Sequence, residues 1–152
     1  MKPVLFLRIA SVLTLIHSAL HTMGGVFGKP APGVAAATDA VMRANQFVVY
    51  GVTRTYFDFL RGMGLGVTIF LTAEAIVFWQ LGSLAKIEAA RLRPILATFM
   101  IAYLVFAVNS YIYFFLMPVI VEIAIAACLG IAIATAKSAV PARTGELAAG
   151  RA

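Results

Sequence analysis

The chain has 152 residues, of which 62% are hydrophobic and only 12% are charged, and its net charge is +6. Soluble domains carry about 25% charged residues, so this composition excludes an ordinary soluble domain and predicts a protein whose solvent is lipid. The length allows one compact domain. The positive charge forms no basic stripe on a polar fold, so we expect no nucleic-acid partner.

Four segments have the roughly 20 apolar residues that a membrane-crossing helix needs. They are residues 4–27, 56–81, 94–117 and 118–136. The first resembles a signal peptide, but Arg8 interrupts it and no typical cleavage site follows, so we expect a retained helix. Pro94 and Pro118 stand where a first helical turn tolerates proline, and Pro118 predicts a tight reversal. The expected fold is all-α, a four-helix transmembrane bundle over residues 1–136, with a polar cytoplasmic tail at 137–152.

The positions of lysine and arginine predict the orientation of these helices. Most fall on one side of the predicted membrane: Lys2, Arg8, Lys86, Arg91, Arg93, Lys137, Arg143 and Arg151. The opposite side has Lys29, Arg43 and Arg54. Because cytoplasmic loops carry the excess of basic residues, we expect both termini in the cytoplasm and the lipid bilayer of a bacterial inner membrane as the surroundings.

The first external loop, residues 28–55, contains a segment with the pattern of an amphipathic helix. Thr38 and Asp39 offer a helix N-cap. Apolar residues then recur on one face, at Val41, Ala44 and Val48. The pattern predicts a short amphipathic helix over residues 39–50, which lies on the outer membrane surface or caps the bundle.

Polar side chains from all four spans fall at one depth, toward the outside. An ionisable side chain in lipid is costly and normally faces the bundle interior or a wet cavity. We therefore predict one shared ligand-binding site, formed by His17, His21, Asp58, Arg61, Asn109, Tyr113 and Glu122. Each of these residues also has an ordinary structural role available, as a helix–helix hydrogen bond, a surface ion pair or a helix-terminus charge. Nearer the cytoplasm, Arg8 and Glu74 lie at similar depths in the predicted membrane, so we expect them to form a structural ion pair.

A metal is a weaker alternative for the two histidines. His17 and His21 are one helical turn apart, which suits a transition metal when carboxylates lie nearby. The spacing alone is a weak signal, and the sequence has neither a cysteine cluster nor an H-E-x-x-H motif. Haem is not expected, because two histidines on one turn cannot supply opposite axial ligands.

Along almost its whole length the chain resembles a set of small four-span bacterial membrane proteins to which no activity is assigned. The resemblance rests on LRIASVLTLIHSALHTMGG, VYGVTRTYFDFLRGMGLGV, WQLGSLAK followed by LRPILA, and YFFLMP leading into IAACLGIA. A looser likeness, in architecture only, is to the sterol-isomerase and sigma-2-receptor type of bundle, which binds flat apolar ligands among intramembrane acids, histidine and tryptophan. Function does not follow from such a likeness.

The sequence favours binding of a small apolar or amphiphilic molecule, such as a lipid, quinone or terpenoid, between the helices. In an enzymatic version, a histidine would exchange a proton with the ligand, and Asp58 or Glu122 would orient that histidine. No nucleophile–base pattern or cofactor motif supports it, so the sequence leans against catalysis. Two alternatives stay open: an accessory structural subunit of a larger membrane complex, and a proton or metal transporter that works as a homo-oligomer.

Overall fold

The computed structural model describes residues 2–136, so the expected tail at 137–152 lies outside the described residues. The described residues form five α-helices and two short strands. Their bounds are α1 Lys2–Leu20, α2 Val34–Ala44, β1 Gln46–Val49, β2 Val52–Thr55, α3 Tyr56–Glu88, α4 Arg93–Tyr113 and α5 Leu116–Thr135. A π-helical turn, His21–Val26, continues α1, and a 3-10 turn, Ala89–Leu92, joins α3 to α4.

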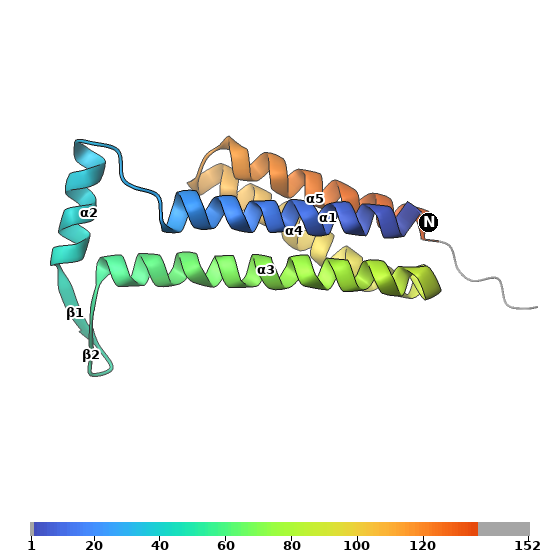
Figure 1. Cartoon of the computed structure of the whole chain (residues 1–152), viewed down its shortest axis with the longest axis horizontal. Helices are drawn as coiled ribbons and strands as arrows, with labels where there is room; N and C mark the ends of the chain where they lie inside the picture. Colours follow the sequence, from blue (N-terminus) through green and yellow to red (C-terminus); the bar gives the residue numbers. More distant parts are fainter. Residues whose placement is uncertain (1, 137–152) are drawn as a thin grey trace, which may run out of the picture.

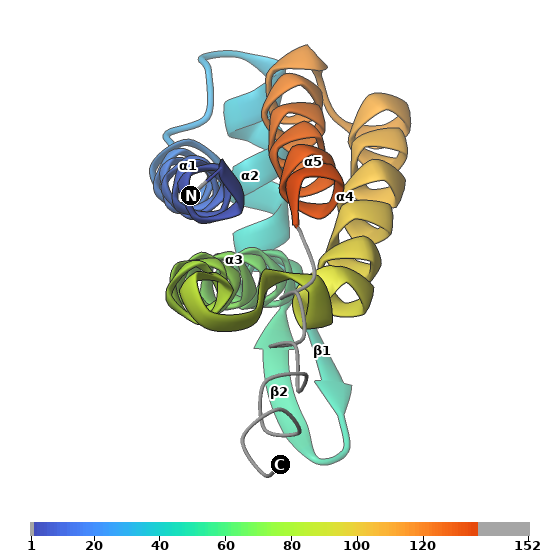
Figure 2. The same cartoon turned by 90° about the vertical axis from the view of Figure 1, so that its right-hand side faces the viewer.

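In Figure 1, α1, α3 and α5 extend along the long axis, α4 runs obliquely behind them, and α2 lies across one end. The view along that axis places α1 beside α3 and α5, and α4 beside α5 (Figure 2). We call the end that carries α2, β1 and β2 the hairpin end. The first amino acids of α1 lie at the opposite end (Figure 1).

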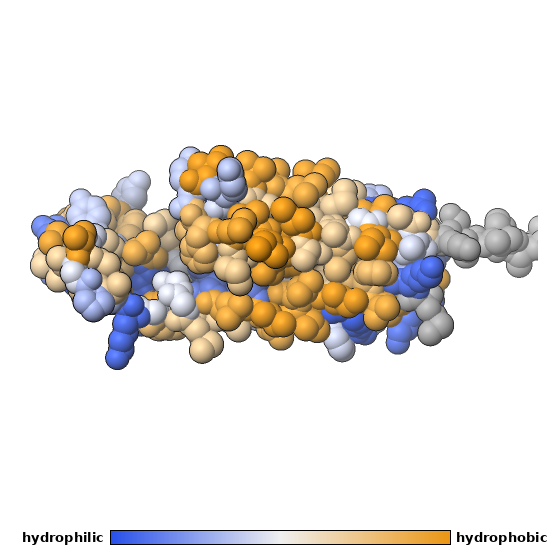
Figure 3. Space-filling view, turned by 90° about the horizontal axis from the view of Figure 1, so that it is seen from above, coloured by the Kyte–Doolittle hydropathy of each residue, from blue (hydrophilic) through white to orange (hydrophobic). Residues whose placement is uncertain are grey.

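Within residues 2–136, three helical runs are long and apolar enough to cross a membrane. They are Lys2–Val26, Tyr56–Tyr113 and Leu116–Thr135, and the middle run contains both α3 and α4. Large apolar side chains along these runs are exposed, among them Leu15, Phe70 and Ile120. Figure 3 shows the result as a broad hydrophobic belt, with hydrophilic residues toward both ends. Soluble monomers rarely expose apolar surface on this scale, so the belt is typical of an integral membrane protein.

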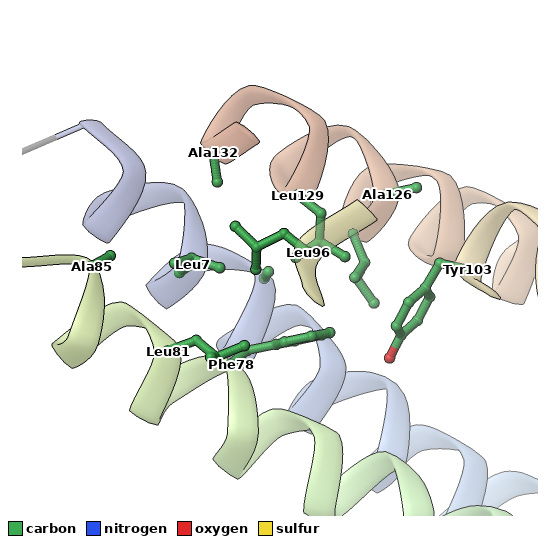
Figure 4. Packing of buried hydrophobic residues seen from close by; sticks show 11 residues of the cluster. Leu7, Phe78, Leu81, Ala85, Leu96, Tyr103, Ala126, Leu129 and Ala132 are labelled. Atoms are coloured by element: carbon green, nitrogen blue, oxygen red, sulfur yellow. The ribbon is translucent and has the colours of Figure 1, made fainter. Parts of the chain in front are cut away.

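The buried apolar core occupies the half of the structure away from the hairpin end. Its members come from α1, α3, α4 and α5 and include Leu7, Phe78, Leu96, Ile125 and Leu129. The ring of Phe78 meets that of Phe99 edge-on, with 5.1 Å between the ring centroids. Figure 4 shows Leu7, Phe78, Leu96 and Leu129 converging, with the Tyr103 ring beside them. Apolar packing therefore fixes how the helices meet at this end.

Nearer the hairpin end, hydroxyl groups join α1 to α3. Ser18 Oγ and Thr72 Oγ1 are 2.9 Å apart, and so are Thr22 Oγ1 and Thr68 Oγ1. Ser11 Oγ donates to the carbonyl oxygen of Ala75 at 2.6 Å. Small hydroxyl residues let helices approach closely in lipid and bond across the interface. They hold α1 and α3 together where the apolar core does not reach.

The segment between α1 and α3 differs from the sequence expectation. The helix begins earlier, at Val34 after Gly33, and ends at Ala44 instead of continuing to residue 50. An antiparallel hairpin follows, with Gln46 opposite Thr55. The signal for it is a run of β-branched residues around Tyr50–Gly51. Both turn residues have positive φ, 47° and 78°, and this is the backbone that a tight two-residue hairpin turn requires.

The tight reversal between the last two helices is confirmed. Only Phe114 and Phe115 lie between α4 and α5. Pro118 follows the reversal, inside the first turn of α5, where its missing N–H needs no helical partner. By contrast, α3 is longer than the predicted span and ends at Glu88 instead of residue 81.

Candidate functional site

Two of the predicted site residues meet inside the bundle. His17 of α1 is buried, and its Nε2 lies 3.9 Å from Glu122 Oε1 of α5. Ser110 of α4 donates its hydroxyl to the same oxygen at 2.8 Å. The His17 ring stacks on Phe106 of α4, with 6.2 Å between centroids. We call His17, Ser110 and Glu122 the His17–Glu122 cluster; it joins three helices near the hairpin end.

The His17–Glu122 cluster is closed to its surroundings. The Glu122 side chain is 0% exposed. Glu122 Oε2 and His17 Nδ1 are buried and have no hydrogen-bond partner among the described residues. A charge left alone in such a place is costly, so the pair should exist either as a neutral carboxylic acid beside a neutral imidazole or as a carboxylate beside an imidazolium. The arrangement can store a proton, but no ligand reaches it without moving a helix or Phe106.

His21 does not join the cluster. Its Nε2 lies 3.0 Å from the carbonyl oxygen of Gly64, on α3. The α-helix ends at Leu20, and His21 is the first residue of the π-helical turn that follows. Gly64 suits the contact, because a Cβ there would already touch Val26 at 3.0 Å.

The other predicted site residues lie on the surface. Asp58 caps α3, since its Oδ2 accepts from the Thr55 backbone N–H at 2.8 Å and its own N–H donates to Thr55 Oγ1 at 3.0 Å. The Arg61 guanidinium lies over the Phe27 ring, 4.9 Å from its centroid. Asn109 and Tyr113 are exposed on α4. The predicted shared site is thus corrected: equal depth in the membrane does not give equal rotation about each helix axis.

The structure also separates Arg8 from Glu74, which corrects the predicted ion pair. The Arg8 guanidinium lies 3.5 Å from the centroid of the Trp79 ring, and Nη2 donates to Ser83 Oγ at 2.9 Å. Ser83 is nine residues beyond Glu74 on α3, about 13 Å at 1.5 Å per residue. Arg8 reaches toward the C-terminal end of α3 instead of toward its middle.

Glu74 has a different partner. The Tyr103 hydroxyl of α4 donates to Glu74 Oε2 at 2.7 Å and lies 3.3 Å from Thr14 Oγ1 of α1. Sequence reasoning missed Tyr103, although it carries a signal. It is a tyrosine in the middle of an apolar span, whereas interfacial tyrosines lie at span ends. A buried phenol needs a hydrogen-bond partner, and Glu74 is the acid at matching depth.

An open cleft of about 480 Å³ lies between α3 and α4. Its polar groups are those of Glu74 and Tyr103. The rest of the wall is apolar or small and includes Met63, Val67, Phe70, Leu71, Ala102 and Phe106. Phe106 also stacks on His17, so this one ring separates the cleft from the His17–Glu122 cluster. The cleft offers an apolar surface with two hydrogen-bonding groups at one point.

Among the described residues, no group of three or more His, Cys, Asp or Glu side chains is placed to hold a metal ion. No protein-family model, curated protein or solved structure matches the chain. The functional argument therefore rests on the geometry of the cleft and of the His17–Glu122 cluster.

Proposed function

We propose that the protein crosses a bacterial inner membrane four times and binds a small apolar or amphiphilic molecule in the cleft between α3 and α4. The proposed crossings are α1, α3, α4 and α5, with 19, 33, 21 and 20 residues. At 1.5 Å per residue, even α1 extends about 28 Å, close to the roughly 30 Å of hydrocarbon in a bilayer. The distribution of basic residues favours cytoplasmic termini.

The observation that carries the binding proposal is the composition of the cleft. A volume of about 480 Å³ falls within the range of roughly 300–1,000 Å³ that is usual for ligand sites. Such sites combine apolar walls with a few polar groups that orient the ligand. Here the apolar walls can take the body of a ligand, and Glu74 with Tyr103 can fix its polar end.

The position of the cleft favours a ligand that arrives from the bilayer. Glu74 and Tyr103 lie near the middle of α3 and α4. In a four-span arrangement this places the cleft close to the centre of the bilayer, beside the acyl chains. The groups that line the cleft are a carboxyl group, a phenol and apolar side chains, and the imidazole of His17 lies behind Phe106. We therefore propose binding and not catalysis.

Native mass spectrometry of the full-length protein, extracted from its own membranes in mild detergent, tests the proposal. We expect a small molecule that stays bound to the protein. Gly66 lines the cleft, and a Cβ there would meet nothing within 4 Å, so Gly66→Leu adds a bulky side chain at the cleft from a position that accepts a Cβ. Occupancy should fall at least tenfold in this variant.

Gly62→Leu is the matched control. It makes the same change one turn earlier on α3, also with nothing within 4 Å of the new Cβ, and Gly62 does not line the cleft. We expect its occupancy to match that of the unaltered protein. Equal occupancy in all three proteins would contradict the proposal. Empty protein that co-purifies with a stoichiometric foreign chain would instead favour an accessory subunit.

A further inference from the structure

We infer that the ligand of the cleft carries a protonated amine on an apolar body, and that Glu74 binds this amine. The inference rests on the proposed function, because it names the class of molecule that the cleft between α3 and α4 would take. It is argued from the charge of the cleft, from the hydrogen bonds of Glu74 and from the rings around it.

Charge is the first argument. The ion pairs among the described residues use other carboxylates: Asp39, Glu88 and Glu122. Glu74 has no basic partner in that part of the chain, and Arg8, which the sequence placed at a similar depth, is held by Trp79 and Ser83. A lone carboxylate near the centre of a bilayer is costly. A cationic ligand would supply the missing charge where the low dielectric makes the attraction strong.

Hydrogen bonding is the second argument. Tyr103 donates to one oxygen of Glu74, Oε2, at 2.7 Å, and this is the hydrogen bond that the described residues make to the Glu74 carboxyl group. The bond fixes the carboxyl group against the wall of the cleft, and Oε1 is left to accept from a ligand. An ammonium group has donors and no acceptors, whereas an anionic head group would bring two acceptors together. The geometry therefore favours a donor.

The aromatic wall is the third argument. Phe70, Tyr103 and Phe106 all line the cleft in which Glu74 lies. Aromatic faces attract cations, and the gain is about 2 kcal/mol or more where the cation is desolvated. An ammonium at Glu74 would therefore lie among groups that stabilise positive charge, while the apolar walls would take the rest of the ligand.

Three soluble probes with one apolar body test the inference: 4-phenylbutylamine, 4-phenylbutanol and 4-phenylbutyrate. Their binding to full-length protein in neutral maltoside micelles is measured at pH 7 by titration calorimetry, with empty micelles as the blank. We expect the amine to bind at least tenfold more tightly than the alcohol, and the acid to bind most weakly. An amine that binds no better than the alcohol would overturn the inference, and this comparison needs no variant.

The variants locate the effect. Glu74→Gln should lower the affinity for the amine at least tenfold, to the affinity for the alcohol. The affinity for the alcohol itself should change by no more than about twofold. Glu88→Gln removes the same charge from the far end of α3, where Glu88 pairs with Arg91 at 3.1 Å, and should leave all three affinities unchanged. An amine preference that survives in Glu74→Gln would refute the role of Glu74. If Gly66→Leu bound all three probes as well as the unaltered protein does, the cleft itself, and with it the proposed function, would be contradicted.

Discussion

Tyr103→Phe removes a single oxygen atom from the interior and tests how the cleft is built. The hydroxyl donates to Glu74 Oε2 at 2.7 Å and lies 3.3 Å from Thr14 Oγ1. The ring itself stays, so its packing against Phe78, at 6.0 Å between centroids, is kept and no cavity forms. The expected loss of stability therefore comes from the hydrogen bonds alone.

The expected loss is about 1–2 kcal/mol. Hydrogen bonds between helices in a membrane average about 0.6 kcal/mol and reach about 1.7. Bonds to charged groups in soluble proteins contribute about 1.5–3 kcal/mol. A buried phenol that bonds a carboxyl group belongs near the upper end of the membrane range. A loss of this size changes the ratio of folded to unfolded protein about 5- to 30-fold.

Unfolding in mixed micelles of maltoside and increasing SDS, followed by circular dichroism, measures the loss. Tyr111→Phe is the matched control: it removes the same atom from the same helix, and the Tyr111 side chain is 75% exposed. We expect a change below about 0.5 kcal/mol there. In a Glu74→Met background, Tyr103→Phe should cost at most half of the stability that it costs in the unaltered protein. Equal losses in Tyr103→Phe and Tyr111→Phe would refute the hydrogen bond that positions Glu74.

Three further predictions test the core, the topology and the hairpin. In the same unfolding assay, Phe78→Ala should cost about 3–5 kcal/mol, because Phe78 is 0% exposed. Ile69→Ala should cost less than about 1 kcal/mol, because Ile69 is 66% exposed. Similar losses in the two variants would contradict the position of the core. Reporter fusions after Gly33 and Arg91 should report opposite sides of the membrane, and a common side would exclude the four-span arrangement. Gly51→Val should destabilise the hairpin by at least about 1 kcal/mol, because φ is 78° there and a β-branched residue fits that conformation poorly; unchanged amide exchange across the strands would count against the turn.

The helices could be predicted from the sequence because their signal is local. Length and apolarity mark the membrane-crossing runs, and Pro118 marks the start of the last helix. The hairpin was missed because Val48 continues the spacing of Val41 and Ala44 on one helix face, so the expected helix was extended to residue 50. The β-branched residues around Tyr50–Gly51 carry the competing preference for strands, and the turn residues decide between the two.

The candidate site could be predicted only in part. Sequence gives depth along each helix, which brought His17 and Glu122 together. It does not give rotation about the helix axis, which packing sets, so Asn109 of α4 faces outward while Ser110, one residue later, bonds Glu122. Sequence also does not show which neighbour each histidine takes: His21 Nε2 lies 3.0 Å from the carbonyl oxygen of Gly64 on α3, whereas His17 lies beside Glu122 of α5.

Photolabelling tests the central claim most directly. A diazirine derivative of 4-phenylbutylamine is activated on the full-length protein in membranes, and the labelled residues are found by peptide mass spectrometry. Labels should gather on Met63, Phe70 and Phe106, which line the cleft, and excess unmodified amine should displace them. Labels spread over the lipid-facing surfaces of α1 and α5, at residues such as Leu5 and Ile120, and unaffected by the competitor would contradict a binding cleft between α3 and α4.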